Sequence, residues 1–459
     1  MKFISTRNAN SDVKTGAVSF LEAVERGLAP DQGLYVPASW PHIDEIKITD
    51  HSFHAIAQKV LTPFLSGDLT AHELRSIVQS AYDFPIPLRY LKNDTAVLEL
   101  FHGPTAAFKD VAARFLARFM DLKVRDNDTP GAHERRTILV ATSGDTGGAV
   151  AAAFDGHPRF QVVVLFPARG VSPLQRQQLT CWSDNVLSLE VNGSFDDCQR
   201  LVKTLLGDAR ARGEHGLSER LNFTSANSIN IGRLLPQMIY HSAAALWYHS
   251  KTGHAPGLII PTGNLGNAVA AFWARQIGMP IREILLATNA NSTLSLFFRT
   301  GKYEPRPSVL TLANAMDVGA PSNFERLQNL FPDWRELKKV SSAVSVSDDD
   351  IRRAIRQGKK DWGEIWCPHT ATAVVARAHA KSPHWIITAT AHPAKFSEIV
   401  TPLIGASLKA GETTTLEMPP NLARLFDRPS RSASIEPTVD AAARALREWK
   451  STARTDNNA

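Results

Sequence analysis

A lysine inside an apolar loop is the first residue of this chain whose setting suggests chemistry. Residues 102–110 read His-Gly-Pro-Thr-Ala-Ala-Phe-Lys-Asp, and apolar residues recur at helical spacing after them. The pattern predicts a helix that begins at Lys109, with Asp110 as a cap and the lysine amine half buried. Desolvation favours a neutral amine, which is the form that makes a Schiff base. Most lysines at helix starts are solvated, so Lys109 needs support from other motifs.

A glycine-rich loop at residues 142–148, Thr-Ser-Gly-Asp-Thr-Gly-Gly, follows a predicted strand and opens a helix of small residues. Backbone N–H groups at a helix N-terminus favour anions. The spacing is not Gly-x-Gly-x-x-Gly, and no acidic residue closes the next predicted strand, so a nicotinamide site is disfavoured. The short polar side chains of Ser143, Asp145 and Thr146 suit a carboxylate or an aromatic hydroxyl instead.

A second loop of this design follows the apolar run 258–262 and precedes an alanine-rich helix. It consists of Gly263, Asn264, Leu265, Gly266 and Asn267. Glycine loops that serve only tight packing are common, but this one also suits a phosphate. If both loops lie at the carboxyl ends of parallel strands, we expect them to face one crevice.

These loops require a scaffold in which strands alternate with helices. Short β-rich runs separated by helical patterns predict βαβ units and a parallel sheet. The runs are 138–141, 162–167, 186–191, 221–225, 258–262, 284–287 and 385–388. Polar stretches at 126–136 and 209–216 are predicted loops, and 430–459 is predicted to be a final helix with a polar tail. We predict an N-terminal domain at 1–97, a large domain at 98–125 with 229–429, and a small domain at 126–228.

Charge, hydropathy and cysteine content argue against several classes of protein. The chain has 459 residues and a formal net charge of +6, but its basic residues are scattered among nearly as many acids. This distribution argues against a nucleic-acid groove. No apolar run is long enough to span a membrane and no signal-peptide core is present, so the cytoplasm is the expected location. The three cysteines, Cys181, Cys198 and Cys367, lack the spacing of a disulfide framework or a metal site.

The lysine segment and the two loops together resemble the fold-type II pyridoxal-phosphate enzymes, the tryptophan synthase β family. Within that group the chain is similar to the threonine synthase family along most of its length. The further matching segments are 27–37, 225–233, 316–317, 321–326, 368–371 and 390–396. The resemblance implies an α/β fold with two open, mostly parallel sheets flanked by helices and an additional N-terminal unit. Leu265, Cys367 and Gln32 depart from the residues usual in that family, which are phenylalanine, aspartate and glycine.

The resemblance also implies a cofactor, pyridoxal 5'-phosphate, and residues that hold it. Lys109 is expected to carry the cofactor and to move protons at the substrate's Cα and Cβ atoms. The loop 263–267 is expected to hold the cofactor phosphate. Thr390 is expected to bond the pyridine nitrogen, although a threonine at the end of a buried strand is also an ordinary structural residue.

The implied substrate is O-phospho-L-homoserine, which is converted with water to L-threonine and phosphate by γ-elimination and addition of water at Cβ. Asn227, Ser228 and Arg233 are the candidates for its phosphate, because Arg233 falls in the first turn of a predicted helix. Ser143, Asp145 and Thr146 are the candidates for its carboxylate and for the cofactor's 3-hydroxyl region. Asp145 is expected to face a cofactor oxygen or the substrate ammonium. A monomer or homodimer without a metal is expected.

Other interpretations remain open at this point. The same scaffold hosts a phospho-lyase that releases 2-oxobutyrate and the serine or threonine dehydratases, because a scaffold does not fix the reaction. A non-catalytic protein that retains the fold is a third possibility, which the presence of Lys109 disfavours. His102, His369 and His392 are predicted to be structural, and Lys395 a cap or a charge behind the site. The acidic run 348–350 is predicted to be the first turn of an exposed helix.

Overall fold

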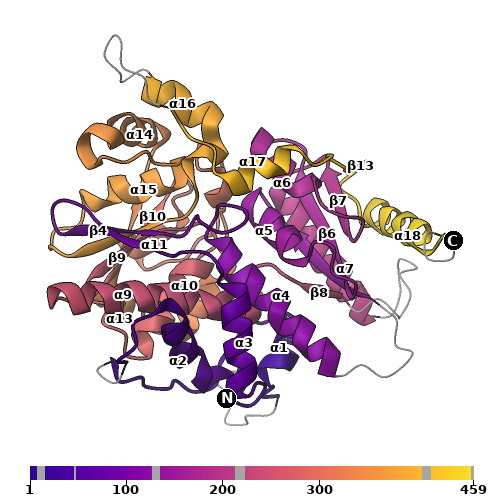
Figure 1. The fold of residues 1–459 in the computed structure, drawn as a ribbon, viewed down its shortest axis with the longest axis horizontal. Helices are drawn as coiled ribbons and strands as arrows, with labels where there is room; N and C mark the ends of the chain where they lie inside the picture. The colour runs from indigo at the N-terminus through magenta and orange to yellow at the C-terminus, as the bar shows by residue number, and fades with distance from the viewer. Residues whose placement is uncertain (8–15, 46–47, 127–134, 212–222, 406–414, 456–459) are drawn as a thin grey trace. The chain divides into compact units, whose positions relative to one another are not determined.

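The computed structural model describes residues 1–7, 16–45, 48–126, 135–211, 223–405 and 415–455 (Figure 1). The chain divides into two compact units, each built around its own open sheet. The first unit is Met1–Phe115 with Ser228–Pro419, and the second is Leu116–Asn227 with Pro420–Ala459. The two mostly parallel sheets and their helices confirm the predicted α/β fold, whereas the four predicted domain boundaries stay predictions.

The first unit is organised around a six-stranded sheet in which only the edge strand β3 runs antiparallel to its neighbour. Its central strands are buried along their whole length and read as apolar runs, because helices cover both faces. In spatial order the strands are β11 (Ser341–Ser345), β10 (Ile284–Thr288), β9 (Gly257–Pro261), β12 (Trp385–Ala389), β4 (Thr95–Glu99) and β3 (Leu88–Tyr90).

Helices lie on both sides of this sheet, with α15 above it and α9 and α10 below it in Figure 1. On one side are α14 (Asp348–Trp362), α15 (Pro368–Arg377) and α16 (Ser397–Gly405); on the other are α9 (Met238–Thr252) and α10 (Gly266–Gln276). Smaller helices of the unit are α8 (Ile231–Leu234), η2 (Leu235–Gln237), α11 (Thr293–Thr300), η3 (Asn314–Met316), α12 (Phe324–Leu330), α13 (Trp334–Val340) and η4 (Pro393–Phe396). The acidic residues 348–350 form the first turn of α14, as predicted.

The N-terminal part of the first unit adds a two-stranded sheet and three helices. Strands β1 (Phe3–Ser5) and β2 (Tyr35–Pro37) pair in antiparallel fashion. The helices are α1 (Phe20–Arg26), α2 (Phe53–Leu65) and α3 (Ala71–Ala81), each preceded by a serine or threonine whose side chain caps it. Helix α2 packs on α9, so this segment covers the outer side of a helix that itself covers the large sheet.

The second unit contains a fully parallel five-stranded sheet. In spatial order its strands are β13 (Ala433–Ile435), β7 (Val186–Val191), β6 (Phe160–Pro167), β5 (Arg136–Ala141) and β8 (Phe223–Ser225). Its helices are α5 (Asp145–Phe154), α6 (Pro173–Thr180), α7 (Phe195–Ala211), α17 (Pro420–Phe426) and α18 (Val439–Thr455). Helix α4 (Lys109–Asp126) begins in the first unit and ends in the second.

Each strand predicted from the sequence is present, and their ends move by no more than two residues wherever both ends are described. The prediction for 430–459 is wrong in part, because Ala433–Ile435 form strand β13, which pairs with β7 before the final helix begins. A strand of three residues is too short to show a periodic pattern. Parts of some predictions lie outside the described residues. These parts are 127–134 in the first predicted loop, 212–222 in the second loop and the start of one predicted strand, and 456–459 in the tail.

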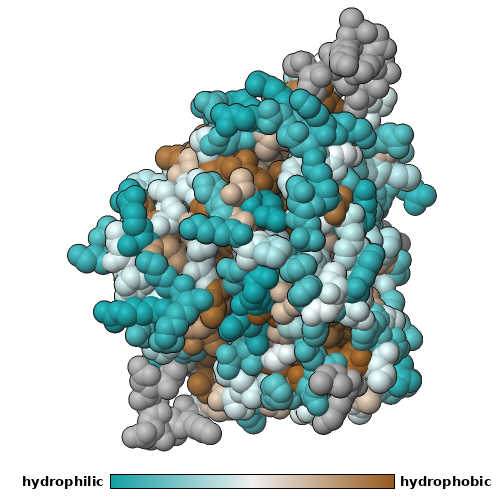
Figure 2. Space-filling model, turned by 90° about the vertical axis from the view of Figure 1, so that its left-hand side faces the viewer, coloured by the Kyte–Doolittle hydropathy of each residue, from teal (hydrophilic) through white to brown (hydrophobic). Residues whose placement is uncertain are grey.

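No helix in the described part of the chain is long and apolar enough to cross a membrane. On the face shown in Figure 2, hydrophilic side chains predominate and apolar residues form only scattered patches. All three cysteines are buried and free. No cluster of metal-ligating side chains occurs among the described residues.

Candidate active site

Lys109 begins helix α4, as predicted, and two buried charged residues hold the loop before it. Asp110 is 1% exposed and accepts hydrogen bonds from Thr105 N (2.9 Å) and Thr105 Oγ1 (2.7 Å). The Lys395 amine, which is 0% exposed, donates to the Thr105 carbonyl at 2.9 Å. Burial raises the pKa of Asp110, and the hydrogen bonds from Thr105 and the charge of Lys395 oppose that rise. The prediction that Asp110 caps the helix is therefore wrong: its carboxylate reaches back to tie the loop to the helix.

The lysine loop is paired with the segment that follows strand β12. Phe108 N donates to Thr390 O at 2.8 Å, and His392 N donates to Ala106 O at 3.0 Å. An antiparallel bridge joins Ala107 to Ala391 between these two bonds. Lys109 and Thr390, which are far apart in the sequence, are thus brought together by backbone hydrogen bonds.

Thr390 uses its backbone but not its hydroxyl within the described protein. Its N–H donates to Thr370 Oγ1 at 3.2 Å, while its own Oγ1 is buried and has no hydrogen-bond partner among the described residues. Cys367 caps helix α15, with its Sγ 3.2 Å from Thr370 Oγ1. A buried hydroxyl without a partner is costly, so a ligand atom that bonds it is expected.

The loop between β9 and α10 is tightly packed and leads into the N-terminus of a helix. A Cβ atom on Gly263 would lie 2.7 Å from the Met316 Cα atom, so no larger residue fits there without a shift. Leu265 has φ +63° at the N-cap of α10 and is fully buried. This conformation is unfavourable for a bulky residue, and such outliers cluster at ligand sites. The N-terminus of α10 directs backbone N–H groups toward the loop, as an anion requires.

The asparagine amides of this loop are hydrogen-bonded to protein groups. Asn267 accepts from Thr262 Oγ1 at 2.7 Å and donates to Pro261 O at 2.8 Å. Asn264 accepts from Ser322 N at 2.6 Å and donates to Ser228 Oγ at 2.8 Å. The amides therefore shape the loop, which leaves its backbone N–H groups for the phosphate contact predicted from the sequence.

Arg233 is 3% exposed, so it is not a surface arginine. Burial lowers its pKa to about 10, while the nearby Asp110 and Tyr240 act to raise it. The guanidinium therefore stays positively charged at neutral pH inside the first unit. A buried guanidinium of this kind is suited to bidentate contact with phosphate oxygens.

The predicted residues Ser143, Asp145 and Thr146 lie in the second unit, at the start of α5. Gly144 has φ +139°, and Thr142 Oγ1 accepts hydrogen bonds from the Gly144 and Gly147 backbone (3.0 and 2.9 Å). Asp145 is buried and its Oδ1 accepts from Gln175 Nε2 at 3.1 Å. The loop is therefore ordered within its own unit.

Asn227 also belongs to the second unit, in which it extends the sheet. Its side-chain amide accepts from Ala141 N at 3.1 Å and donates to Ala141 O at 2.6 Å. These two bonds imitate a further residue of β8 beside β5. The division between units falls between Asn227 and Ser228, so the phosphate candidates do not all lie in one unit.

Comparison with known proteins identifies the family. Residues 85–384 match the model for pyridoxal-phosphate dependent enzymes, 2–82 the threonine synthase N terminus, and 369–446 the threonine synthase C-terminal region. The chain is 36% identical to a threonine synthase of Escherichia coli over 444 residues, which cover 95% of this chain and 96% of that protein. It is 37% identical to the enzyme of Haemophilus influenzae, with 86% and 91% covered. The chain belongs to the threonine synthase family.

Solved threonine synthases share its fold. The crystal structure from Escherichia coli has a TM-score of 0.87 and 33% identity, and covers 98% of this chain and 100% of that one. The pyridoxal-phosphate-bound structure from Brucella melitensis has a TM-score of 0.84 and 33% identity, with 98% and 99% covered. As a member of the threonine synthase family, the chain is a pyridoxal-phosphate-dependent lyase.

The residues of the first unit fit this cofactor. The cofactor's aldehyde, pyridine nitrogen and phosphate require an amine, a hydroxyl and an anion site. The first unit offers the Lys109 amine, a Thr390 hydroxyl that is buried and unbonded within the described part of the chain, and a glycine loop at a helix N-terminus. Hydrogen bonds join the lysine loop directly to the Thr390 segment. The cofactor predicted from the sequence is thus supported both by the family and by the side chains present.

The structure brings together part of the predicted site and adds residues that the sequence interpretation missed. Lys109, Thr390, the loop 263–267, Ser228 and Arg233 lie in the first unit, and their individual roles stay predictions. The missed residues are Thr105, Gln175, Asn323 and Arg326, together with the loop-binding role of Lys395. Asn323, Arg326 and Lys395 stand in segments that match the threonine synthase family, but their types alone gave no role.

Proposed function

We propose that this member of the threonine synthase family converts O-phospho-L-homoserine and water to L-threonine and phosphate. The observation that supports the proposal is the backbone pairing of the Lys109 loop with the Thr390 segment, because a lysine amine and a buried hydroxyl belong to these two paired segments. The buried, charged Arg233 supports a phosphorylated substrate.

Lys109 both holds the cofactor and serves as the base in this proposal. Pyridoxal phosphate, when bound, supplies an electron sink for negative charge at the substrate's Cα atom. The Lys109 amine takes the proton from Cα and later moves protons at Cβ. Asp110 and Lys395 keep its loop in place, so that the amine stays oriented while its proton state changes.

Arg233 and Ser228 are proposed to bind the substrate phosphate, the group that leaves from Cγ. Asn227 is proposed to assist them, although its amide already bonds Ala141. Ser143 and Thr146 are proposed to bind the substrate carboxylate through the start of α5. Asp145, held by Gln175, is proposed to face the substrate ammonium or a cofactor oxygen rather than the carboxylate.

Product analysis tests this proposal against the phospho-lyase. The purified holoenzyme is given O-phospho-L-homoserine, and phosphate, threonine and 2-oxobutyrate are assayed together. We expect phosphate and threonine in equal amounts, and a loss of at least about 10³-fold in Lys109→Ala. Lys381→Ala, at an exposed lysine, is the matched control and keeps full activity. Phosphate matched by 2-oxobutyrate contradicts the proposed product.

A cytoplasmic location and a monomeric or homodimeric state are also proposed. Cell fractionation tests the first and light scattering the second. The proposal includes no nucleic acid, membrane or metal partner.

A further inference from the structure

Two buried polar residues without an assigned role, Asn323 and Arg326, lie against the segment that carries Ser228. Arg326 is 0% exposed, and within the described residues its guanidinium donates only to uncharged oxygens. These are Tyr35 O (3.0 Å), Ser228 O (3.0 Å), Ile229 O (2.7 Å) and Asn323 Oδ1 (2.6 Å). Arg326 thus joins the N-terminal part of the chain to both residues at the start of the 228–233 segment.

Arg326 determines which way the Asn323 amide faces. A guanidinium is only a donor, so the Asn323 atom that it contacts must be the oxygen. The Asn323 Nδ2 atom is then directed to Ser228 Oγ (3.1 Å) and Asn264 O (2.9 Å). Asn264 is oriented in the same way, because its Oδ1 accepts from the Ser322 backbone N–H at 2.6 Å.

Both lone pairs of the Ser228 hydroxyl are filled as a result. Asn264 Nδ2 donates to Ser228 Oγ at 2.8 Å and Asn323 Nδ2 donates at 3.1 Å. A serine hydroxyl has two acceptor positions and one hydrogen, so this hydroxyl is left with donation only. None of the residues that the structure describes accepts that hydrogen. Ser228 is only partly buried, so this hydrogen is available to an oxygen of water or of a ligand.

We propose that Asn323 and Arg326 are positioning residues that fix the Ser228 hydroxyl as a hydrogen-bond donor to a phosphate monoester. The inference rests on the proposed function, which supplies two sources of this chemistry, the substrate and the cofactor. Ser228 is adjacent to the loop 263–267, because a Cβ atom on Gly266 would lie 3.2 Å from the Ser228 Cβ. The charge of Arg326, which is hydrogen-bonded to uncharged oxygens, adds a favourable potential for an anion.

The isosteric variant Asn323→Asp separates this role from a purely structural one. An aspartate keeps the shape and strengthens the contact with Arg326, but it also turns a carboxylate oxygen toward Asn264 O, so these opposing effects are expected to leave the melting temperature within a few degrees of wild type. The carboxylate accepts hydrogen bonds and cannot donate, so the Ser228 hydroxyl turns toward it. We expect the affinity for a phosphate monoester to fall about 10- to 100-fold, as for a lost hydrogen bond to a charged group.

Three measurements on the holoenzyme distinguish the two sources of phosphate. They are the KM and kcat for O-phospho-L-homoserine, the inhibition constant of inorganic phosphate, and the rate of cofactor loss on dilution, followed by visible absorbance. A rise in KM and in the inhibition constant, with kcat and cofactor loss unchanged, assigns Ser228 to the substrate phosphate. Faster cofactor loss assigns it to the cofactor phosphate.

Asn93→Asp is the matched control, because it makes the same charge change at an exposed asparagine of the same unit. Ser228→Ala provides a second route if Asn323→Asp does not fold, and is expected to shift the same constants in the same direction. The proposal is overturned if folded Asn323→Asp, or Ser228→Ala in its place, leaves all these constants at wild-type values. A wild-type chain that does not turn over O-phospho-L-homoserine contradicts the proposed function alone, because direct binding of inorganic phosphate to the holoenzyme and the rate of cofactor loss still test the network.

Discussion

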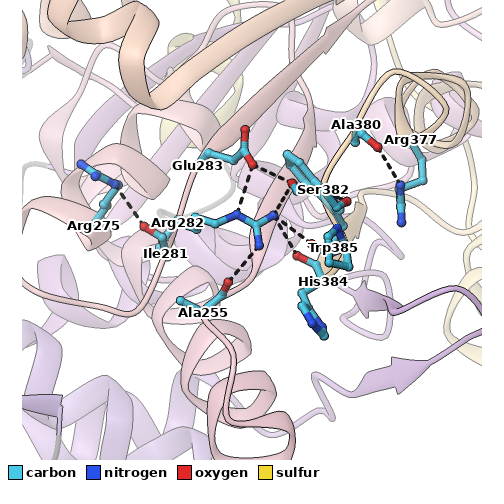
Figure 3. A network of polar contacts seen from close by, with 11 residues as sticks. Ala255, Arg275, Ile281, Arg282, Glu283, Arg377, Ala380, Ser382, His384 and Trp385 are labelled. Carbon is cyan, nitrogen blue, oxygen red and sulfur yellow. Dashed lines mark hydrogen bonds and ion pairs between the residues drawn. The ribbon is translucent and has the colours of Figure 1, made fainter.

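The two ends of the six-stranded sheet in the first unit differ in how fully their polar groups are hydrogen-bonded by the protein. At the amino end, Arg282 donates to Ala255 O (3.4 Å), Glu283 Oε1 (3.1 Å), Ser382 Oγ (2.7 Å) and Pro383 O (2.9 Å), as Figure 3 shows in part. Ser382 in turn donates to Glu283 at 3.0 Å. The loops that enter β9, β10 and β12 are thus fastened by one guanidinium.

The carboxyl end of the same strands is less completely hydrogen-bonded. The Thr390 hydroxyl is buried without a partner among the described residues, and Ala106 and Leu265 are held at φ +51° and +63°. Ligands of open α/β sheets bind at this end. The comparison indicates that the amino end contributes stability and that the carboxyl end leaves a hydrogen bond unmet for a ligand. Backbone strain does not distinguish the two ends, because Asn93, Asp94 and His384 at the amino end also have positive φ values.

The largest effect is expected from a change at the carboxyl end, Arg233→Met. Methionine fills much of the buried space but removes the charge, so KM for the phosphorylated substrate is expected to rise about 10²- to 10³-fold. Steady-state kinetics checks this, and cofactor content is measured in parallel. An unchanged KM contradicts the role of Arg233 in phosphate binding and weakens the contrast between the two ends.

At the amino end, Arg282→Ala is expected to cost stability and not activity. Losing its several hydrogen bonds and its contact with the Trp385 ring, whose centre lies 5.4 Å away, lowers the free energy of unfolding by about 2–3 kcal/mol. Arg282 and Glu283 are partly exposed, which limits the contribution of their ion pair. Urea unfolding measures the loss. A fall in kcat of the folded variant contradicts the division of labour between the two ends.

The sequence predicted much of the carboxyl end and little of the amino end. Lys109 and the loop 263–267 combine residue types with a helix start, and that local pattern is visible in a sequence. Arg282 and Arg326 act on carbonyl groups of distant loops, and no local pattern records such contacts. The bonds that Asp110 accepts from Thr105, and those between Asn227 and Ala141, escape prediction because side chains of both types also serve as ordinary caps.

Acid should weaken the carboxyl end through His392, whose pKa burial lowers to about 4. In the unfolded chain histidine binds a proton near pH 6.5, so stability is present above that pH and is lost as the pH falls toward 4. His392 Nδ1 accepts from Ala394 N at 3.2 Å, and asparagine can replace that cap. We expect His392→Asn to reduce the loss of stability between pH 7 and pH 4.5 by about 2 kcal/mol. Urea unfolding at the two pH values tests this, and an unchanged difference contradicts it.

The smallest effect is expected from relieving backbone strain. Two variants compare a strained residue at the site with a strained residue elsewhere. Ala106 and Gln32 are both non-glycine residues in the left-handed region, at φ +51° and +65°, but only Ala106 belongs to the lysine loop. Replacing either by glycine relieves strain and adds freedom to the unfolded chain, so stability is expected to change by less than about 1 kcal/mol in both variants. Ala106→Gly also loosens the backbone that positions Lys109, so its kcat is expected to fall several-fold, whereas Gln32→Gly keeps wild-type kcat. Equal kcat values in the two variants indicate that strain at the carboxyl end has no part in orienting the lysine.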